Sequence, residues 1–426
     1  MIFFRRGPGI AGASTGDLLT LNDSDFNDRL IKFVSENKGA FNPELFTWIS
    51  EDLIRALDHR PTQLADVGFV YNYQNDAFRT AQELNLFHFS AAKDLAEIQR
   101  LNELFRKSHS FNEFYNLAKQ EMDVFNKTWQ KTEWNTAVLI ASSTETYNRL
   151  QSKVKLFPYW EYKTVGDDKV RPEHQLLNGI ILPASDLLWK EIWPPNGWSC
   201  RCYIVPRLPF EVKDVDFESM RSRVNDFFET PEWKSAQAQG FGVNRALLPE
   251  IFDENQMYLK KFPRMASKLL QDVNYDTYAL KSMEASRANA LSDLPAYTGT
   301  AADFFKKLLS EDGKIFFKDY NGRAVLFDEA AYLKGHAEEK YAERTAMLTG
   351  AEETLKTPDE VWVNNYKGKL YNQYLFLKYY KDQTLAVLAE IKEGTVYRLK
   401  TWFTVKETGA TKYKYRHGLL IKKPGY

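Results

Sequence analysis

The segment 157–206 constrains the fold of this chain most, because it concentrates residue types that ordinary core sequence spreads out. It contains both cysteines and four of the ten tryptophans. It also contains turn-forming residues: Arg-Pro at 171–172, Asn-Gly at 178–179 and Pro-Pro-Asn-Gly at 194–197. Glycine, proline and asparagine favour turns for different steric reasons. We therefore expect short strands and ordered loops in this segment.

The sequence on either side of this segment has helical patterns. Residues 24–150 repeat apolar side chains at helical spacing, and Ser110 with Glu113 forms a capping box that predicts a helix start. Residues 211–295 contain several helical pieces and few turn residues. We expect helices before the segment 157–206 and a helical connector after it.

The last part of the chain changes character after Pro358. An amphipathic helix is predicted over 327–349. Its apolar side consists of Leu333, Ala337, Tyr341 and Leu348. Beyond Pro358, aromatic and β-branched runs alternate with glycine-containing breaks, which is the pattern of antiparallel hairpins. This order predicts helices followed by an antiparallel β-meander.

The whole chain is expected to be an α+β multidomain protein. Its 426 residues fit two or three domains. We expect an N-terminal arm and helices at 1–65, a helical domain with a small strand-and-loop region at 66–210, a helical connector at 211–295, and a C-terminal α+β domain at 296–426.

The composition and the first residues indicate the cellular location of the protein. Hydrophobic residues make up 44% of the chain and charged residues 27%, which excludes general disorder. Two cysteines in so long a chain do not form a secreted disulfide scaffold. Residues 1–6 place the charges after the apolar side chains, the reverse of a signal peptide, and no run approaches the roughly 18 apolar residues that span a bilayer. We expect a bacterial cytoplasmic protein with no signal peptide and no membrane partner.

The C-terminal end is basic although the net formal charge of the chain is zero. From residue 394 onward, eight Lys and Arg side chains are opposed by Glu407 alone. The cations are Arg398, Lys400, Lys406, Lys412, Lys414, Arg416, Lys422 and Lys423. A basic segment on a neutral protein indicates a polyanionic ligand.

Three polar residues of the predicted helix 327–349 share one stripe. His336, Lys340 and Arg344 follow one another at intervals of four residues. A histidine beside two cations is suited to proton transfer next to a phosphate. The alternative is an ordinary solvated helix face, in which none of the three has a chemical role.

Two strand-like runs near the C-terminus interleave basic and aromatic residues. In the first run, alternation places Arg398, Lys400 and Thr404 on one face, and Tyr397, Thr401 and Phe403 on the other. In the second run, Lys412, Lys414 and Arg416 lie opposite Tyr413, Tyr415 and His417. Such a surface suits RNA, because bases stack on rings while phosphates meet cations. The alternatives are a core-facing Thr401 and edge-strand charges at 412, 414 and 416 that prevent aggregation.

A metal site is conceivable at Cys200, Cys202 and His174. Two thiolates and an imidazole suit Zn²⁺ in a structural role. A structural zinc site normally has four protein ligands. No fourth ligand is apparent from the sequence, and Asp186 and His109 are guesses for this position. The alternatives are two small buried hydrophobic cysteines, or a disulfide in an oxidised particle. His174 would then order the loop around the Asn-Gly turn.

The segment 157–206 also resembles a known family. The matching pieces are Arg-Pro-Glu-His at 171–174, Leu-Asn-Gly at 177–179 and Pro-Pro-Asn-Gly-Trp-Ser-Cys-Arg-Cys at 194–202. In this order they resemble the phage Mu F-like head morphogenesis family, the MuF domain, over roughly residues 70–210. The resemblance implies that this part docks on the portal or the inner capsid during head assembly.

The C-terminal part resembles the barnase–EndoU–colicin E5/D–RelE (BECR) ribonuclease superfamily, in the version found at the ends of phage head proteins. The resemblance covers roughly residues 310–423. The matching pieces are Gly-His at 335–336, Thr-Pro-Asp-Glu-Val-Trp at 357–362, Lys-Tyr-Tyr-Lys-Asp at 378–382, Lys-Thr-Trp-Phe at 400–403 and Tyr-Arg-His-Gly-Leu-Leu at 415–420. It implies RNA cleavage without a metal cofactor, by attack of the ribose 2′-OH on the adjacent phosphate.

The resemblance also implies roles for the residues singled out above. His336 would be the general base or acid, Thr401 a hydrogen-bond donor to phosphate, Arg416 a phosphate clamp and His417 a second proton-transfer group. The expected RNA-binding residues are Lys340, Arg344, Lys400, Lys412, Lys414 and Tyr415.

Together these resemblances indicate a phage or prophage minor head protein with a fused ribonuclease toxin. The virion would carry the toxin domain inside the head, and an immunity protein would protect the producing cell by docking on the basic sheet. The rival hypothesis is a purely structural, portal- or capsid-associated head protein whose basic module binds nucleic acid or scaffold without cleavage. A third idea, ADP-ribosyl transfer, has no nucleotide-binding motif to support it.

Overall fold

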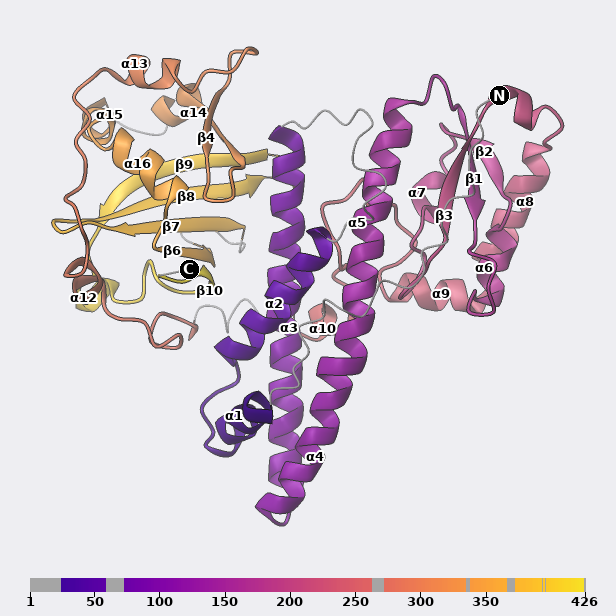
Figure 1. Ribbon diagram of the computed structural model, residues 1–426, viewed down its shortest axis with the longest axis horizontal. Coiled ribbons are helices and arrows are strands. Elements are labelled where there is room, and N and C mark those ends of the chain that lie inside the picture. The colour runs from indigo at the N-terminus through magenta and orange to yellow at the C-terminus, as the bar shows by residue number, and fades with distance from the viewer. Residues whose placement is uncertain are drawn as a thin grey trace. The chain divides into compact units, whose positions relative to one another are not determined.

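The computed structural model describes residues 24–58, 73–262, 272–334, 338–365, 372–392, 394 and 396–424. The chain divides into two compact units (Figure 1). The first comprises Met1–Val70 and His88–Phe262, and the second comprises Tyr71–Phe87 and Pro263–Tyr426. These units cut across two of the four expected segments, because residues 71–87 and 263–295 belong to the second unit. The small, glycine-rich part of the expected N-terminal arm lies outside the described residues.

Helices build the first part of unit 1. They are α1 Ser24–Ser35, α2 Pro43–Asp58, most of α3 Tyr73–Lys107, α4 Phe111–Asp123, the π-helix η1 Val124–Trp129, and α5 Gln130–Ser152. The predicted helix start is confirmed, because the Ser110 side chain accepts a hydrogen bond from the amide of Glu113 at 3.2 Å. Among the described helices, none combines the length and the apolar character that crossing a bilayer requires.

A buried polar network joins these helices. Lys93 Nζ donates to Gln130 Oε1 at 2.7 Å and to Glu133 Oε2 at 2.5 Å, and all three side chains are buried. Asn126, in the π-helix, donates to Glu97 Oε1 at 2.7 Å. Burial raises the pKa of Glu97 from 4.5 to about 8, since the charge of Lys93 only partly offsets the loss of water.

The raised pKa of Glu97 makes the stability of this unit depend on pH. Between pH 4.5 and about 8 the folded chain holds a proton that the unfolded chain has released, so the free energy of unfolding falls as pH rises. Glu97→Gln removes this titration and is expected to raise the free energy of unfolding at pH 8 by roughly 1–3 kcal/mol. Urea unfolding from pH 5 to pH 8.5 measures it. The same substitution at the exposed Glu51 should change little, and an unchanged pH slope in Glu97→Gln would contradict the prediction.

The expected short strands and loops at 157–206 are confirmed. A three-stranded antiparallel sheet has the order β2-β1-β3, with β1 Tyr159–Lys163, β2 Ile181–Pro183 and β3 Tyr203–Arg207. The helices α6 Pro172–Leu177 and α7 Trp189–Ile192 lie in the loops between these strands. Three of the four tryptophans of this segment, Trp160, Trp189 and Trp193, pack together, and the ring centroids of Trp160 and Trp193 are 5.2 Å apart.

The expected connector contributes to the same core. The short helix η2 Pro209–Val212 precedes α8 Phe217–Phe228, α9 Pro231–Ala238 and α10 Met257–Lys261. Val224, Phe227 and Trp233 of α8 and α9 are buried in one cluster with the tryptophans of the sheet. Residues 211–238 are thus part of the strand-and-loop region's core.

Unit 2 is built on a seven-stranded sheet with the order β10-β6-β7-β8-β9-β5-β4 (Figure 1). The central strands β6 Glu360–Asn364, β7 Gln373–Tyr379, β8 Thr384–Lys392 and β9 Val396–Val405 form the expected antiparallel meander. The hairpin of β4 Ile315–Lys318 and β5 Ala324–Phe327 was missed, although the Asn-Gly turn at 321–322 signals it. Because β5 pairs with β9 in parallel, the sheet is mixed. The remaining elements are α12 Met283–Arg287, α13 Ala301–Lys306, η3 Gly409–Thr411 and β10 Leu419–Lys422.

The prediction of one helix over 327–349 is wrong. The structure has α14 Glu329–Lys334, α15 Glu338–Thr345 and α16 Leu348–Lys356 in this region. Leu333, assigned to the apolar side, is 43% exposed, whereas its neighbour Tyr332 is buried. Residues 346–347 form a turn between α15 and α16, so a single helix does not continue to 349, and Ala337 lies outside the described residues.

The predicted alternation along the two basic runs is also wrong in part. Between β8 and β9 the pairing shifts from Leu388–Thr401 to Ala389–Leu399, so Lys400 is the extra residue of a β-bulge. Tyr397 therefore shares a face with Leu399 and Trp402, not with Thr401. The second run, 412–416, is not a strand: turns follow η3, and the strand β10 begins only at Leu419.

The first turns of α3 belong to unit 2. Arg323, beside β5, donates to both carboxylate oxygens of Glu83, at 2.6 and 2.5 Å. The amide of Ala324 donates to Asp76 Oδ2 at 2.8 Å, and the Tyr374 hydroxyl contacts the carbonyl of Thr80 at 3.3 Å. Burial alone would raise the pKa of Glu83, but the hydrogen bonds and charge of Arg323 lower it. A fragment that starts after α3 would leave Arg323 without this partner.

Candidate functional site

The structure brings together two of the predicted RNA-site residues from α15 and β9. Arg344 Nη1 donates to Thr401 Oγ1 at 2.8 Å and to the Tyr332 hydroxyl at 2.7 Å. The backbone carbonyl of Arg344 accepts from Trp402 Nε1 at 2.9 Å. Tyr332 stacks on Trp402, with ring centroids 5.0 Å apart and an interplanar angle of 8°. The guanidinium is therefore held in place from two sides while its side chain stays partly exposed.

The neighbours of this pair are basic. Lys340 lies one turn before Arg344 on α15 and is exposed. Lys400, next to Thr401, has its Nζ 3.2 Å from Glu390 Oε2, so its charge is shared with a carboxylate. His336 lies outside the described residues, and its assigned role stays a prediction.

Sequence reasoning missed Tyr332 as part of this site. Tyr332 lies four residues before His336 in the sequence, the same interval that separates His336, Lys340 and Arg344. The hydroxyl also places Tyr332 near any group bound by Arg344. The helix pattern alone assigns Tyr332 only to the core, which is where its ring indeed packs.

Arg416 lies in a different setting from the one its predicted role requires. It is fully buried, and its Nε and Nη2 donate to the two carboxylate oxygens of Glu360 at 2.9 and 2.7 Å. Glu360 also accepts from the Tyr379 hydroxyl at 2.7 Å and from Trp362 Nε1 at 2.8 Å. The Tyr275 ring covers the guanidinium at 4.2 Å. A phosphate could reach Arg416 only if this ion pair opened, so the clamp role stays a prediction.

The other predicted residues of the C-terminal run lie in turns around Arg416. His417 Nε2 is 3.1 Å from Asn365 Oδ1, and burial lowers the pKa of His417 below its ordinary value. Lys412 Nζ is 3.1 Å from Asp276 Oδ2. Lys414 Nζ lies 5.3 Å from the centre of the Tyr415 ring. Their roles in RNA binding or proton transfer stay predictions.

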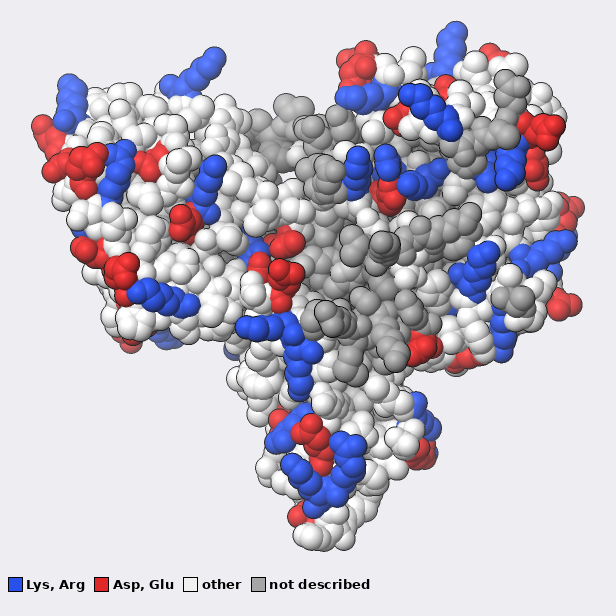
Figure 2. All heavy atoms as spheres, turned by 180° about the vertical axis from the view of Figure 1, so that it is seen from behind, with Lys and Arg blue, Asp and Glu red and all other residues white. Residues whose placement is uncertain are grey.

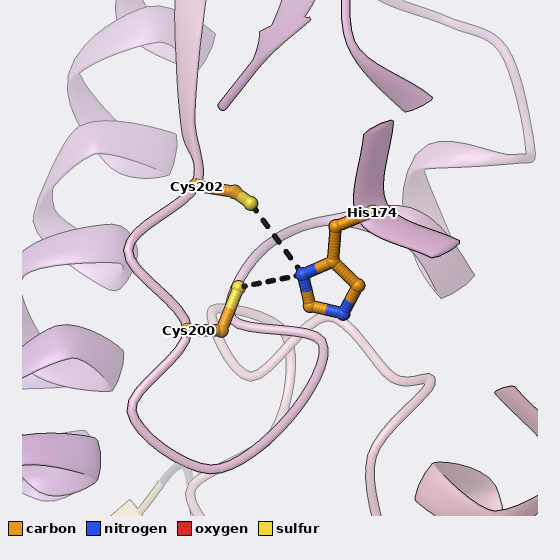
Figure 3. Close-up of side chains that lie close together, drawn as sticks. All are labelled: His174, Cys200 and Cys202. Carbon is orange, nitrogen blue, oxygen red and sulfur yellow. Dashed lines mark hydrogen bonds between the residues drawn. The ribbon is translucent and has the colours of Figure 1, made fainter. Parts of the chain in front are cut away.

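Unit 1 contains a second cluster, formed by the three predicted metal ligands. His174 Nδ1 is 3.5 Å from Cys200 Sγ and 3.6 Å from Cys202 Sγ (Figure 3). His174 comes from α6, and both cysteines come from the loop before β3. Cys200 and His174 are buried, and Cys202 is partly buried. Within the described part of the chain, this is the group of His, Cys and acidic residues whose ligand atoms could hold a metal ion.

The surroundings of this cluster influence the two thiols differently. Hydrogen bonding by Cys202 and the nearby imidazole of His174 lower the pKa of Cys200, while the thiolate of Cys200 raises the pKa of Cys202. The Tyr162 hydroxyl lies close enough to the sulfurs for them to raise its pKa beyond the effect of its burial. Asn196 Nδ2 donates to this hydroxyl at 3.1 Å.

The two residues considered as a fourth ligand are engaged elsewhere. Asp186 accepts from Arg221 Nε at 3.0 Å and from the amide of Leu188 at 3.1 Å. His109 is exposed in the loop before α4. Neither Asp186 nor His109 therefore serves as a fourth ligand of the cluster.

On the face of the molecule shown in Figure 2, Lys and Arg side chains are interspersed with Asp and Glu side chains. This matches the net charge of zero. Any polyanion site must therefore depend on local groups such as Arg344 and Lys340 and not on the field of the whole protein.

Two family models match the chain in the regions that carry these sites. Residues 100–205 match the model described as Phage Mu protein F like protein. Residues 303–422 match the model described as phage-Barnase-EndoU-ColicinE5/D-RelE like nuclease2. The chain thus contains a phage head morphogenesis F-like domain and a BECR-like nuclease domain, as the sequence resemblances indicated.

Relatives with curated descriptions match over a short region. The chain is 36% identical over 73 residues to "Putative capsid assembly protein F" of Escherichia phage Mu, a match that covers 17% of each chain. It is 35% identical over 74 residues to "Mu-like prophage FluMu F protein" of Haemophilus influenzae, covering 17% of this chain and 18% of the relative. The match thus spans less than a fifth of either relative. No solved structure matches the chain significantly.

Proposed function

We propose that this chain, which joins a phage head morphogenesis F-like domain to a BECR-like nuclease domain, is a phage or prophage minor head protein that carries a metal-independent ribonuclease. The nuclease model covers residues 303–422, which include all the predicted RNA-site residues. The ribonuclease would be a toxin that acts on RNA of an infected or competing cell.

The contact between Arg344 and Thr401 carries the enzymatic part of this proposal. These residues are 57 positions apart in the chain, and their side chains meet at 2.8 Å. A guanidinium and a hydroxyl that converge in this way offer several N–H and O–H donors to one phosphate. The Tyr332 hydroxyl adds a third donor at the same guanidinium.

The mechanism follows from placing the scissile phosphate on these donors. His336 lies four residues before Lys340 in the sequence. It removes the proton from the ribose 2′-OH, and the 2′-oxygen then attacks the phosphorus atom. A second proton-transfer group, for which His417 is the candidate, protonates the departing 5′-oxygen. Arg344 and Thr401 stabilise the negative charge that develops on the phosphate oxygens. The chemistry requires no metal ion or other cofactor.

The F-like domain supports the proposed place in a phage particle. The relative in phage Mu is described as a putative capsid assembly protein. We propose that unit 1 contacts portal or capsid proteins during assembly in the bacterial cytoplasm, and that the nuclease then travels inside the head of the virion. A cognate immunity protein would cover the nuclease in the producing cell.

Incubation of the full-length chain with total RNA tests the enzymatic proposal. The full chain is needed because unit 2 includes residues 71–87 as well as the C-terminal part. We expect discrete RNA fragments with 2′,3′-cyclic phosphate ends, formed equally with and without EDTA. Intact RNA with a folded protein, or cleavage that EDTA abolishes, would contradict it.

A structural, nucleic-acid-binding role is the second candidate. The burial of Arg416 against Glu360 favours it over cleavage, because Arg416 is the residue that the resemblance assigns to hold the phosphate during the reaction. Such a binder would lose affinity steeply with salt and without regard to sequence. Binding without cleavage in the experiment above would support this role.

A further inference from the structure

We propose that Cys200, Cys202 and His174 hold one divalent metal ion of the zinc class. The site lies in unit 1, so the inference does not depend on the proposed ribonuclease activity. The ion would fasten α6 to the loop that leads into β3 and thereby fix the fold of the F-like domain.

The two distances from His174 Nδ1 to the sulfurs fit tetrahedral coordination of zinc. Zinc bonds of about 2.3 Å to sulfur and about 2.0–2.1 Å to nitrogen, at an angle of about 109°, separate the sulfur from the nitrogen by about 3.6 Å. His174 Nδ1 lies 3.5 and 3.6 Å from the two sulfurs. The three ligand atoms all lie within 4.8 Å of one another, so the group could hold one ion.

A carboxylate lies near the second ring nitrogen of His174, beyond hydrogen-bond distance. Its Nε2 lies 3.8 Å from Glu173 Oε1, and both side chains are largely buried. A carboxylate near Nε2 favours the tautomer with its proton on Nε2, which leaves Nδ1 able to bind a metal. The carboxylate thus favours the tautomer that the site requires.

The backbone holds the two cysteines in position before any ion binds. Ser199 adopts a left-handed conformation with φ of 53°, and its amide donates to Thr136 Oγ1 at 3.0 Å. Arg171 Nη2 donates to the carbonyl of Trp198 at 2.6 Å. A strained, braced turn directly before Cys200 is typical of a site with a function. These contacts come from α5 and from the residue before α6, so the loop is fixed on both sides.

The fourth coordination position is left to a water molecule or another small ligand. Among the described residues, the cluster offers three side-chain ligands. Three protein ligands and one exchangeable position are the arrangement of catalytic zinc sites, whereas purely structural sites usually have four protein ligands.

Metal analysis of the purified full-length chain tests this inference. The chain is kept reduced, incubated with zinc and freed of unbound metal, and zinc is measured per chain. We expect about one zinc per chain. Cobalt in its place should give the visible spectrum of tetrahedral coordination with a thiolate charge-transfer band. Cys200→Ser, Cys202→Ser and His174→Gln should each abolish stoichiometric binding, and Glu173→Gln should weaken it about 10–100-fold.

Matched controls make each outcome decisive. His109→Gln, at an exposed histidine of the same unit, should retain the metal. Full binding by the Cys200 and His174 variants, or no zinc and no cobalt spectrum in a folded wild-type chain, would overturn the inference. A Cys200–Cys202 disulfide found by mass spectrometry in the reduced preparation would also overturn it. If the variants fail to fold, the cobalt spectrum of the wild-type chain decides the question.

Discussion

Arg344→Ala is expected to lower the turnover rate of RNA cleavage by about 10²–10³-fold, equivalent to about 2.7–4 kcal/mol of transition-state stabilisation. The reason is that Arg344 is the guanidinium that Thr401 and Tyr332 hold at the proposed phosphate position, at 2.8 and 2.7 Å. Its charge would act most strongly when negative charge develops on the phosphate oxygens. Single-turnover cleavage of a defined RNA by the full chain measures the effect.

Three further variants separate catalysis from folding in this experiment. Arg287→Ala removes a comparable arginine of unit 2, which donates to the carbonyl of Asp382 at 3.2 Å, and should leave cleavage unchanged. Arg344→Lys keeps the charge but loses the forked geometry, so it should recover only part of the rate. His336→Ala should change the pH profile of the remaining activity, whereas Arg344→Ala should only lower it. An unchanged turnover rate in Arg344→Ala would refute the assigned role.

The residues of both sites could be predicted from the sequence more readily than the contacts that position them. Cys200, Cys202 and His174 could be grouped in advance, because few residue types bind soft metals and the chain has only two cysteines. That His174 lies between the two sulfurs depends on the packing of α6 against the loop before β3, which no local pattern contains. The meander could likewise be predicted from its glycine-containing breaks, since these signals are local.

The predictions that failed depended on contacts between distant segments. Alternation along β9 ends at the bulge of Lys400, and the pairing with β8 that creates the bulge is set by the whole sheet. The family resemblance implies a phosphate-clamp role for Arg416, yet its position depends on Glu360, 56 residues earlier. The role of residues 71–87 in unit 2 is invisible in the sequence for the same reason.

Arg416→Ala is expected to lower the free energy of unfolding of unit 2 by about 3–5 kcal/mol, because it leaves Glu360 buried without its cation. Both side chains are fully buried, and they are linked by two hydrogen bonds of 2.9 and 2.7 Å. Urea unfolding, followed through hydrogen exchange of the amides of β6 and β7, measures the effect within this unit. The double variant Arg416→Met with Glu360→Gln removes both charges and should recover much of the loss.

The same variant distinguishes the two roles considered for Arg416. Lys412→Ala removes an exposed cation paired with Asp276 and should hardly affect stability, since water screens that pair. If Arg416→Ala unfolds more easily but the folded fraction still cleaves RNA, the arginine is structural. If stability is unchanged while cleavage is lost, the ion pair must open during the reaction and Arg416 must bind the phosphate, as its sequence motif suggested. The buried geometry favours the first outcome, because opening the pair would expose two charges and break the hydrogen bonds from Tyr379 and Trp362 around them.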